Sequence, residues 1–402
     1  MKISILIPTR DRLELLQLAV SSALAQDDKN IEVLVSDNNS AESAVPWLES
    51  LQDSRLRWLR HEQTLPVTKN WNAALEAATG DYIIMLGDDD ALCKTYVRSI
   101  RQLVQEHGTP DCIYHGAYLF TYPGVTPGTS EGCVHESRNA VFWRNGKSCY
   151  FLSRKKRLRL VNDAMRFYSS YGFNMQFVTL RRSLIEDLSR AGDFYQSPYP
   201  DYFAMNNVML HAQRVLVAET PLVCIGVSPK SFGWYFQNNQ EDSGNEHLGI
   251  VRQDGSAAGL APGALLPGTT MNTNWLLAIT TLKLANNEHG RLKPPSLARY
   301  RRKQIVFFAL MIVAGDVTPS QQAGFRRLLS KRERAYLSLL LTVSAAFPSR
   351  AAFLRFLHTL SQKRIDYVLR AGLRRLFSAT PVLEVERGKT ILDTELIVAP
   401  ID

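Results

Sequence analysis

Residues 80–90 decide the fold, and they read GDYIIMLGDDD. The apolar run from Tyr82 to Leu86 predicts a short strand that other elements cover on both faces. Three aspartates follow, Asp88, Asp89 and Asp90, and no Lys or Arg stands within three positions of them to relieve their mutual repulsion. Hard cations such as Mg²⁺ and Mn²⁺ bind carboxylate oxygens and commonly bridge to phosphates. Because ligands of open α/β sheets bind beyond the carboxyl ends of strands, this stretch predicts a site for a metal ion and a diphosphate.

The net charge is unevenly spread along the chain. Its 402 residues include 47 Lys and Arg against 38 Asp and Glu, a balance of +9. From Arg291 to the end there are 20 basic and 8 acidic residues, so this part alone carries +12 and the rest carries −3. The asymmetry predicts an anionic partner for the C-terminal part, either a membrane surface or a polyanion. No nucleic-acid binding module accompanies the charge, so nucleic acid is not expected as a partner.

Cysteine usage and hydropathy bear on the cellular compartment. The five cysteines form no CxxC pair and no cluster with histidine, which is typical of reduced thiols in the cytosol. Pro8 interrupts the short apolar run at the N-terminus, so no signal peptide is expected. The most apolar C-terminal run, residues 305–314, is shorter than the roughly 20 residues that cross a bilayer. We therefore expect a cytoplasmic protein. Its basic C-terminal helices either make peripheral contact with the inner face of the membrane or form the exposed faces of an ordinary helical bundle.

Strand and helix patterns alternate over the first part of the chain. Strands are expected at residues 3–7, 31–36, 56–60, 82–86, 112–118, 215–218 and 222–227, and helices at 12–25, 44–51, 66–78 and 94–106. This rhythm predicts βαβ units, a mostly parallel sheet and a Rossmann-like α/β fold. From about residue 270 to 377 the pattern is helical. We therefore expect an α/β domain over residues 1–265, with halves at 1–92 and 93–265, and an all-helical basic domain over 266–402.

Polar residues follow the predicted strands at their carboxyl ends, where the loops of a doubly wound sheet converge. The candidate ligand-binding residues there, besides Asp88 and Asp89, are Pro8, Thr9, Arg10, Asp11, Asp37 and Asn38. A carboxylate such as that of Asp37 can accept a hydrogen bond from a uracil-like base or from ribose hydroxyls. Lys69, in the helix before the aspartate strand, is placed to reach the base or a phosphate.

Each of these features also has a simpler explanation. The aspartates at 88–90 would form a turn that caps the helix expected near Lys94, since Asp is a favoured N-cap residue. Asp37 and Asn38 would form an Asx-turn, and Lys69 would be solvated. The functional interpretation is favoured because all of these residues occur together at matching positions in the predicted topology.

Several motifs occur in a fixed order along the first 90 residues. They are Pro-Thr at 8–9, DNNS at 37–40, Lys-Asn at 69–70, GDYI at 80–83 and then the aspartates. In this order they resemble the nucleotide-binding half of a family 2 glycosyltransferase with the GT-A fold, and the resemblance extends to about residue 230. It implies that Thr9 and Asp37 hold the nucleoside and that Lys69 stands where the family has an Arg near the base. It also implies that the aspartates bind the ribose and a metal ion that bridges the diphosphate.

Two positions depart from the family pattern. The run Arg10-Asp11-Arg12 replaces Tyr-Asn-Arg, which leaves the role of Asp11 undefined. Gly87 stands where many members have the first Asp of an Asp-x-Asp motif, so two registers are open. One uses Asp88 with Asp90, and the other makes Asp89 the main ligand. All three aspartates are therefore predicted ligands of Mn²⁺ or Mg²⁺.

An inverting sugar transfer needs a general base beside the acceptor hydroxyl. Members of the family carry this carboxylate at the start of a helix after the acceptor-side strand, and the matching residue is Asp201, between Pro200 and Tyr202. The alternative is that Asp201 only caps the helix. Glu186 and Asp187 are less favoured as the base, because their helical setting predicts solvated side chains.

The resemblance thus implies an inverting, metal-dependent glycosyltransferase of the hexosyl type. Its donor would be a nucleotide-diphosphate sugar, with a UDP-sugar preferred, and its acceptor a hydroxyl of a glycan or of a lipid-linked glycan. Assembly of bacterial surface polysaccharide is the expected setting. The alternative is a non-catalytic protein that binds a nucleotide sugar or a glycan on the same fold. A sugar-nucleotide pyrophosphorylase is disfavoured, because no Gly-rich phosphate loop stands near the N-terminus.

Overall fold

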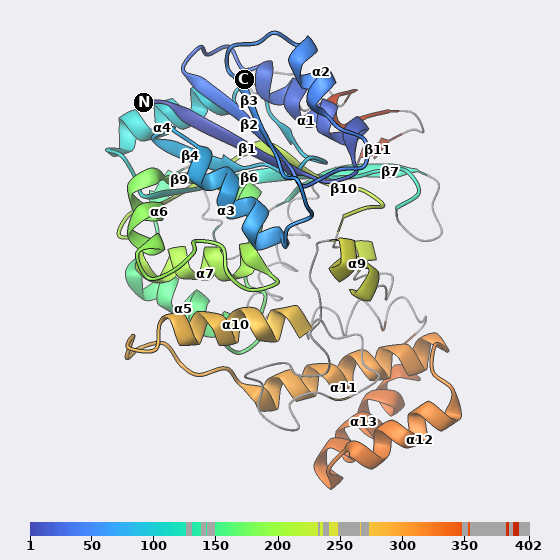
Figure 1. Ribbon diagram of the computed structural model, residues 1–402. Helices are drawn as coiled ribbons and strands as arrows, with labels where there is room; N and C mark the ends of the chain where they lie inside the picture. Colours follow the sequence, from blue (N-terminus) through green and yellow to red (C-terminus); the bar gives the residue numbers. More distant parts are fainter. Residues whose placement is uncertain are drawn as a thin grey trace.

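A single mixed β-sheet forms the centre of the molecule, with helices on both of its faces (Figure 1). The computed structural model describes residues 1–125, 131–137, 142, 149–231, 234–235, 241–247, 266, 273–347, 353, 383–385 and 389–393. Its strands are β1 (Ile3–Thr9), β2 (Ile31–Asp37), β3 (Leu56–Arg60), β4 (Tyr82–Met85), β5 (Ala91–Leu92), β6 (Cys112–Thr121), β7 (Gly132–Ser137), β8 (Cys149–Phe151), β9 (Val178–Arg181), β10 (Val215–Val227) and β11 (Leu383–Val385). Within the described ranges the strand order is β11-β7-β6-β9-β4-β1-β2-β3, and β10 pairs with β5, β6 and β8.

The two longest strand pairs, β1 with β2 and β6 with β10, are parallel, which agrees with the predicted mostly parallel α/β architecture. β1 pairs in parallel with β2 on one side and with β4 on the other, β2 pairs with β3, and β6 pairs with β10. The antiparallel pairs involve β5, β7, β8, β9 and β11. Every residue of β1 and β2 is buried, as expected for strands covered on both faces. The register places Thr9 opposite Asp37, so the loops that follow these two strands start side by side.

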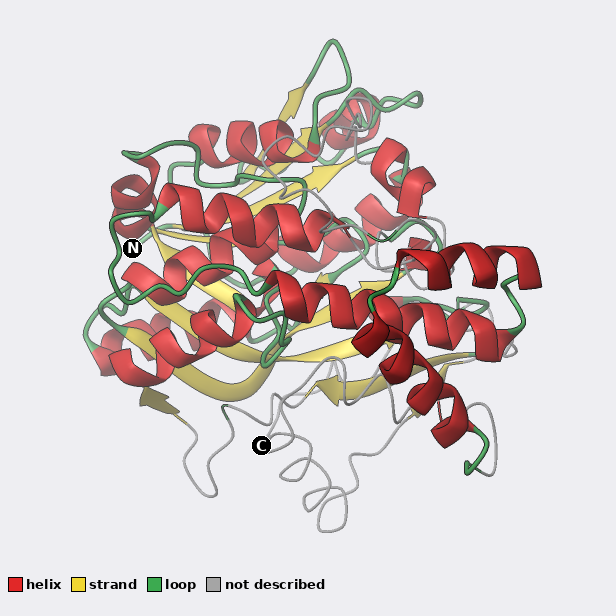
Figure 2. Ribbon diagram, turned by 90° about the horizontal axis from the view of Figure 1, so that it is seen from below, coloured by secondary structure: helices red, strands yellow, loops and turns green. Residues whose placement is uncertain are grey.

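Helices cover the sheet from both sides. They are α1 (Leu13–Leu24), α2 (Val45–Ser50), α3 (Val67–Ala77), α4 (Tyr96–His107), α5 (Arg154–Ala164), α6 (Arg182–Ser189), α7 (Pro200–His211), α9 (Glu241–His247), α10 (Thr273–Ala285), α11 (Leu297–Ala314), α12 (Pro319–Leu328) and α13 (Lys331–Ser344), with 3₁₀ turns at Met175–Phe177 and Ile391–Asp393. α1 and α3 both pack on β1 and β2, from opposite faces (Figure 1). Seen from below, helices lie as a layer across the strands (Figure 2).

The predicted helical C-terminal part is confirmed over α10 to α13, but its apolar residues belong to two cores. α10 contributes Trp275 and Ile279 to the large core around the sheet. A second core includes Phe308, Phe325 and Leu337 from α11, α12 and α13. The predicted boundary at 265/266 stays a prediction, and the packing of α10 associates that helix with the sheet. β11 also returns to the sheet and pairs with β7. In the part of the chain that is described, no helix is both long enough and apolar enough for a membrane crossing.

Candidate functional site

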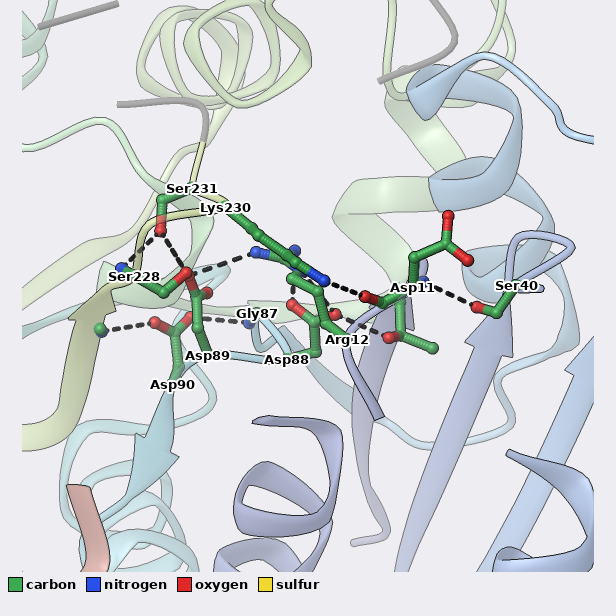
Figure 3. A network of polar contacts seen from close by, with 12 residues as sticks. Asp11, Arg12, Ser40, Gly87, Asp88, Asp89, Asp90, Ser228, Lys230 and Ser231 are labelled. Carbon is green, nitrogen blue, oxygen red and sulfur yellow. Dashed lines mark hydrogen bonds and ion pairs between the residues drawn. The ribbon is translucent and has the colours of Figure 1, made fainter. Parts of the chain in front are cut away.

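The three aspartates lie at the carboxyl end of β4, as predicted, and all three are buried. Their side chains have different sets of partners, although Asp88 and Asp89 share Arg12 (Figure 3). Asp88 faces the loop after β1, Asp89 faces the turn after β10, and Asp90 turns back toward backbone amides.

Asp88 is fully buried and is held by two side chains from the loop after β1. Thr9 Oγ1 donates to Asp88 Oδ2 over 2.6 Å, and Arg12 Nε donates to the same oxygen over 3.0 Å. Arg12 Nη2 lies 2.5 Å from Asp88 Oδ1, yet that oxygen is buried without a well-directed hydrogen bond. Burial raises the pKa of Asp88 to about 6, although the Arg12 charge opposes the shift. Thr9 therefore positions Asp88, and Arg12 supplies the positive charge that the carboxylate needs.

Asp89 joins the same cation to the turn that follows β10. Arg12 Nη1 lies 3.3 Å from Asp89 Oδ2, so one guanidinium bridges Asp88 and Asp89. The hydroxyls of Ser228 and Ser231 donate to Asp89 Oδ2 over 2.9 and 2.5 Å. Two segments more than 130 residues apart in the sequence thus meet at one carboxylate (Figure 3).

Asp90 braces the backbone and has no direct part in this cluster. Its Oδ1 accepts the N–H of Gly226 over 2.8 Å, and its Oδ2 accepts the N–H of Gly87 over 2.7 Å. Glycine is needed at both positions, because a Cβ on Gly226 would lie 1.8 Å from the Asp89 carbonyl oxygen and one on Gly87 would lie 2.5 Å from Asp90 Oδ2. Burial and the neighbouring Asp89 raise the pKa of Asp90.

A three-carboxylate metal site does not fit this arrangement. Within the described ranges no group of three Asp, Glu, His or Cys side chains is placed to hold a metal ion. The physical reason is that both oxygens of Asp90 already accept backbone N–H groups. The residues that fit a cation are Asp88, with its under-satisfied Oδ1, and Asp89. Mg²⁺ and Mn²⁺ are often held by one or two carboxylates together with substrate phosphates, so this pair suffices for such a site.

The loop after β1 is tied to the loop after β2. Asp11 has φ of +54°, in the left-handed region that non-glycine residues seldom adopt. Ser40 Oγ accepts the N–H of Asp11 over 2.9 Å, and Asp11 Oδ1 accepts the N–H of Ala41 over 2.8 Å. Lys230 Nζ donates to the carbonyl oxygen of Asp11 over 2.7 Å, which brings another cation over the cluster (Figure 3). Arg10 lies 3.4 Å from the carboxylate of Asp11, and Pro8 is buried within β1.

Asp37 and Asn38 are used to fix the backbone in this structure. Asp37 Oδ1 accepts the N–H of Ser40 over 2.9 Å, and its Oδ2 forms an ion pair with Arg60 at the end of β3. Both polar atoms of the Asn38 amide bond the backbone of Leu65, each over 2.8 Å. The Asx-turn explanation therefore accounts for one oxygen of Asp37, which accepts the N–H of Ser40. The side-chain amide of Asn38 is already bonded to the backbone of Leu65.

Lys69 is solvated and pairs with an acidic residue. Its ammonium lies 2.7 Å from Asp193, with the two side chains 63% and 45% exposed. One turn later, the Asn72 amide exchanges two hydrogen bonds with the backbone of Tyr195, over 2.9 and 3.0 Å. These contacts fasten α3 to the segment that leads into α7.

Asp201 lies in the first turn of α7 and is half-buried. Tyr199 is the N-cap residue of this helix, so the cap position is not that of Asp201. Its Oδ1 accepts the N–H of Tyr202 over 2.8 Å. Burial raises the pKa of Asp201 to about 7. The Asp201 charge adds to burial in raising the pKa values of Tyr195 and Tyr199, so both phenols lie near it. A carboxylate that is half ionised at neutral pH suits proton transfer.

The cluster is completed by Arg12, Ser228 and Ser231, which are not among the site residues predicted from the sequence. A signal for Arg12 existed, because buried carboxylates need a positive charge and the loop at 10–12 follows a strand that converges on them. The two serines have only their spacing after a predicted strand as a signal, which is weak.

Part of the chain is similar in sequence to known proteins. Residues 4–159 match the family model described as Glycosyl transferase family 2. The GalNAc(5)-diNAcBac-PP-undecaprenol beta-1,3-glucosyltransferase of Campylobacter jejuni is 32% identical over 108 residues, which cover 26% of this chain and 35% of that protein. The Escherichia coli protein UDP-Glc:alpha-D-GlcNAc-diphosphoundecaprenol beta-1,3-glucosyltransferase WfaP is 31% identical over 88 residues, which cover 22% of this chain and 35% of that protein.

A solved structure, S. aureus TarS 1-349 in complex with UDP-GlcNAc, covers 86% of this chain and 92% of its own, at 14% identity and a TM-score of 0.46. The chain spans about a third of the length of the two sequence relatives, 35% in each case. The family match runs from β1 to α5 and includes the loops after β1, β2 and β4. Over residues 4–159, this chain thus matches glycosyl transferase family 2.

Proposed function

We propose that this chain is an inverting glycosyltransferase that moves a sugar from a nucleotide-diphosphate sugar to a hydroxyl group. The observation that carries the proposal is the cluster at the end of β4. There the carboxylates of Asp88 and Asp89 lie beside the cationic side chains of Arg12 and Lys230. A diphosphate needs positive charge and a sugar needs hydrogen-bond acceptors, and this edge of the sheet offers both.

The donor would occupy the loops after β1, β2 and β4. Asp88 and Asp89 are the residues that would hold Mn²⁺ or Mg²⁺, and such an ion, when bound, neutralises charge on the leaving diphosphate. Arg12 would then shift its contacts from the carboxylates to the phosphate oxygens. Asp37, with Arg60 beside it, is the candidate for the nucleoside, while Thr9 keeps Asp88 in place. Lys69 would need to leave Asp193 to reach a base.

Asp201 would act as the general base. Its ionised carboxylate takes the proton from the acceptor hydroxyl, and the freed oxygen attacks the anomeric carbon on the face opposite the diphosphate. The bond from that carbon to the diphosphate breaks, and the diphosphate leaves with the electron pair. A pKa near 7 leaves Asp201 about half ionised at neutral pH and basic enough to accept the proton.

The acceptor class comes from the relatives. Two of them carry undecaprenyl diphosphate acceptors in their names, and one of these names UDP-Glc as the donor. We therefore propose a UDP-sugar donor and a lipid-linked glycan acceptor, in bacterial surface polysaccharide assembly. This chemistry takes place where the lipid is, so we propose a location at the cytoplasmic face of the membrane.

Nucleotide binding tests the proposal first. We expect UDP with Mn²⁺ to raise the thermal midpoint of the protein, because a ligand at 100 times its Kd stabilises the folded state by about 2.7 kcal/mol. Asp89→Asn should remove most of this shift. Asp187→Asn is the matched control, since Asp187 is 61% exposed on α6 and should leave the shift unchanged.

Donor hydrolysis and transfer are then measured with the same protein and a panel of nucleotide sugars. UDP release that depends on Mn²⁺ or Mg²⁺ supports the transferase. Tight binding with no release of UDP in any acceptor mixture would instead support a non-catalytic nucleotide-sugar binding protein. An unchanged midpoint with every nucleoside diphosphate would contradict both.

A further inference from the structure

A cavity of about 540 Å³ lies beside α5 and gathers six cationic side chains. The loop between α10 and α11 runs next to α5 (Figure 1) and contributes Arg291 and Lys293 to the lining of the cavity. The six cations of this basic pocket are Arg154, Lys155, Arg159, Arg166, Arg291 and Lys293. One buried carboxylate, that of Asp163, faces these six positive charges. None of the lining residues belongs to the aspartate cluster or to α7.

Asn162, Leu292 and Ser296 hold the loop that lines the pocket against the rest of the protein. Asn162 Nδ2 donates to the carbonyl oxygen of Arg291 over 3.2 Å, and Asn162 Oδ1 accepts the N–H of Lys293 over 2.9 Å. Leu292, between these two cations, is buried and anchors the loop in the main core. The N–H of Ser296 donates to the carbonyl oxygen of Met165 over 2.9 Å, which holds the far end of the loop against α5. The two loop cations are therefore held opposite those of α5.

The charges are arranged against the stability of the helix. Arg154 and Lys155 occupy the first turn of α5, which has no acidic residue, and the positive end of a helix dipole disfavours cations there. Arg154 and Arg291 also add to burial and His211 in lowering the pKa of His289, which indicates that both cations act on the same region. Arg154, Lys155, Arg291 and Lys293 have no ion pair with any residue in the described ranges. Five of the six cations are exposed and Arg166 is half-buried, so the pocket is open to solvent and its charges are accessible to an anion.

We infer that the basic pocket binds a phosphate-bearing anion with at least two negative charges, such as a diphosphate. Arginine forks match phosphate oxygens in pairs, and the N-terminal turn of α5 adds its dipole. The volume exceeds what one phosphate needs and lies within the usual range for ligand sites. The anion can be the headgroup of a lipid or a free diphosphate, and the inference holds whether or not the chain transfers a sugar.

Calorimetry with inorganic pyrophosphate in EDTA tests this site. The double variant Arg291→Glu with Lys293→Glu should bind pyrophosphate about tenfold more weakly or worse, because two charge-assisted contacts are lost. The control is Lys94→Glu with Arg98→Glu, which makes the same change in net charge at exposed positions near the start of α4 and should leave the affinity unchanged. Asn162→Ala keeps all six charges but releases the loop, and should also weaken binding. Equal affinity in all variants, or equal weakening by the control, would overturn the site.

Vesicles identify the source of the anion. Sedimentation is compared between phosphatidylcholine vesicles and vesicles that contain phosphatidylglycerol, with wild type and the same two double variants. If the pocket variant alone loses both vesicle and pyrophosphate binding, the site takes a lipid headgroup. If it loses pyrophosphate but sediments like wild type, the site takes a soluble diphosphate.

Discussion

Asp201→Asn will lower the rate of sugar transfer by about two to four orders of magnitude, the usual contribution of a general base. Asparagine keeps the shape of the side chain but cannot accept the proton from the acceptor hydroxyl. Since the N–H of Tyr202 can still donate to the side-chain oxygen, the first turn of α7 should stay intact. The measurement is kcat with a fixed donor and acceptor, together with UDP binding, which should not change.

The pH dependence separates a chemical loss from unfolding. Burial raises the pKa of Asp201 from its ordinary value to about 7, so its ionised form destabilises the folded state as pH rises from about 4 to 7. The amide side chain in Asp201→Asn carries no such charge, and this variant should therefore be at least as stable as wild type at pH 8 and no more stable at pH 4. In wild type the rate should rise with pH to a half-maximum near 7, and this limb should be missing from the residual rate of the variant. Full activity in Asp201→Asn would remove Asp201 from the chemistry.

Arg12→Met will destabilise the protein by about 3–5 kcal/mol at pH 8, the usual loss when one partner of a buried ion pair is removed. Arg12 is 16% exposed, and the carboxylate of Asp88 that it neutralises is fully buried. The pKa of Asp88 is already raised to about 6 with Arg12 present, and it should rise further without this cation. At a pH below about 6 the Asp88 carboxylate of wild type is mostly protonated, so it needs no positively charged partner. The loss should therefore be complete at pH 8 and should shrink as the pH falls toward 5.

Chemical unfolding at both pH values measures this effect. The matched control is Arg190→Met, whose partner Asp187 is 2.9 Å away with both side chains largely exposed, 80% and 61%. Exposed pairs contribute about 1 kcal/mol or less, so the control should change little at either pH. A loss in Arg12→Met that is small, or that grows as the pH falls, would mean that Arg12 does not neutralise the cluster.

Much of the fold follows from local patterns. The buried runs of β1, β2 and β4 and the helices between them depend on periodicity within a few residues, which the sequence displays directly. β10 is different. The sequence predicts two short strands, at 215–218 and 222–227, but the structure has one strand that pairs with β6, with register shifts on either side of Pro221. Such an irregularity is set by the neighbouring strand, as are the packing of α10 in the first core and the return of β11 to the sheet.

The site could be predicted only in outline. Topology alone brings Thr9, Asp37 and the aspartates to one edge, because parallel strands end together. The partner of each side chain depends on contacts between distant segments. Arg12 and Asp88 are 76 residues apart, and Ser228 and Asp89 are 139 apart. The sequence shows three adjacent aspartates and does not distinguish them. Only the structure shows that Asp90 accepts backbone N–H groups, while Asp88 and Asp89 bond side chains.

A crystal structure of the protein with a nucleoside diphosphate and Mn²⁺ is the most direct test of the central claim, that Asp88 and Asp89 exist to hold a diphosphate through a cation. The expected result is a manganese ion on these two carboxylates, with the diphosphate on the ion and Arg12 turned toward the phosphates. A diphosphate bound elsewhere on the molecule, with Arg12 still bridging Asp88 and Asp89, would contradict it.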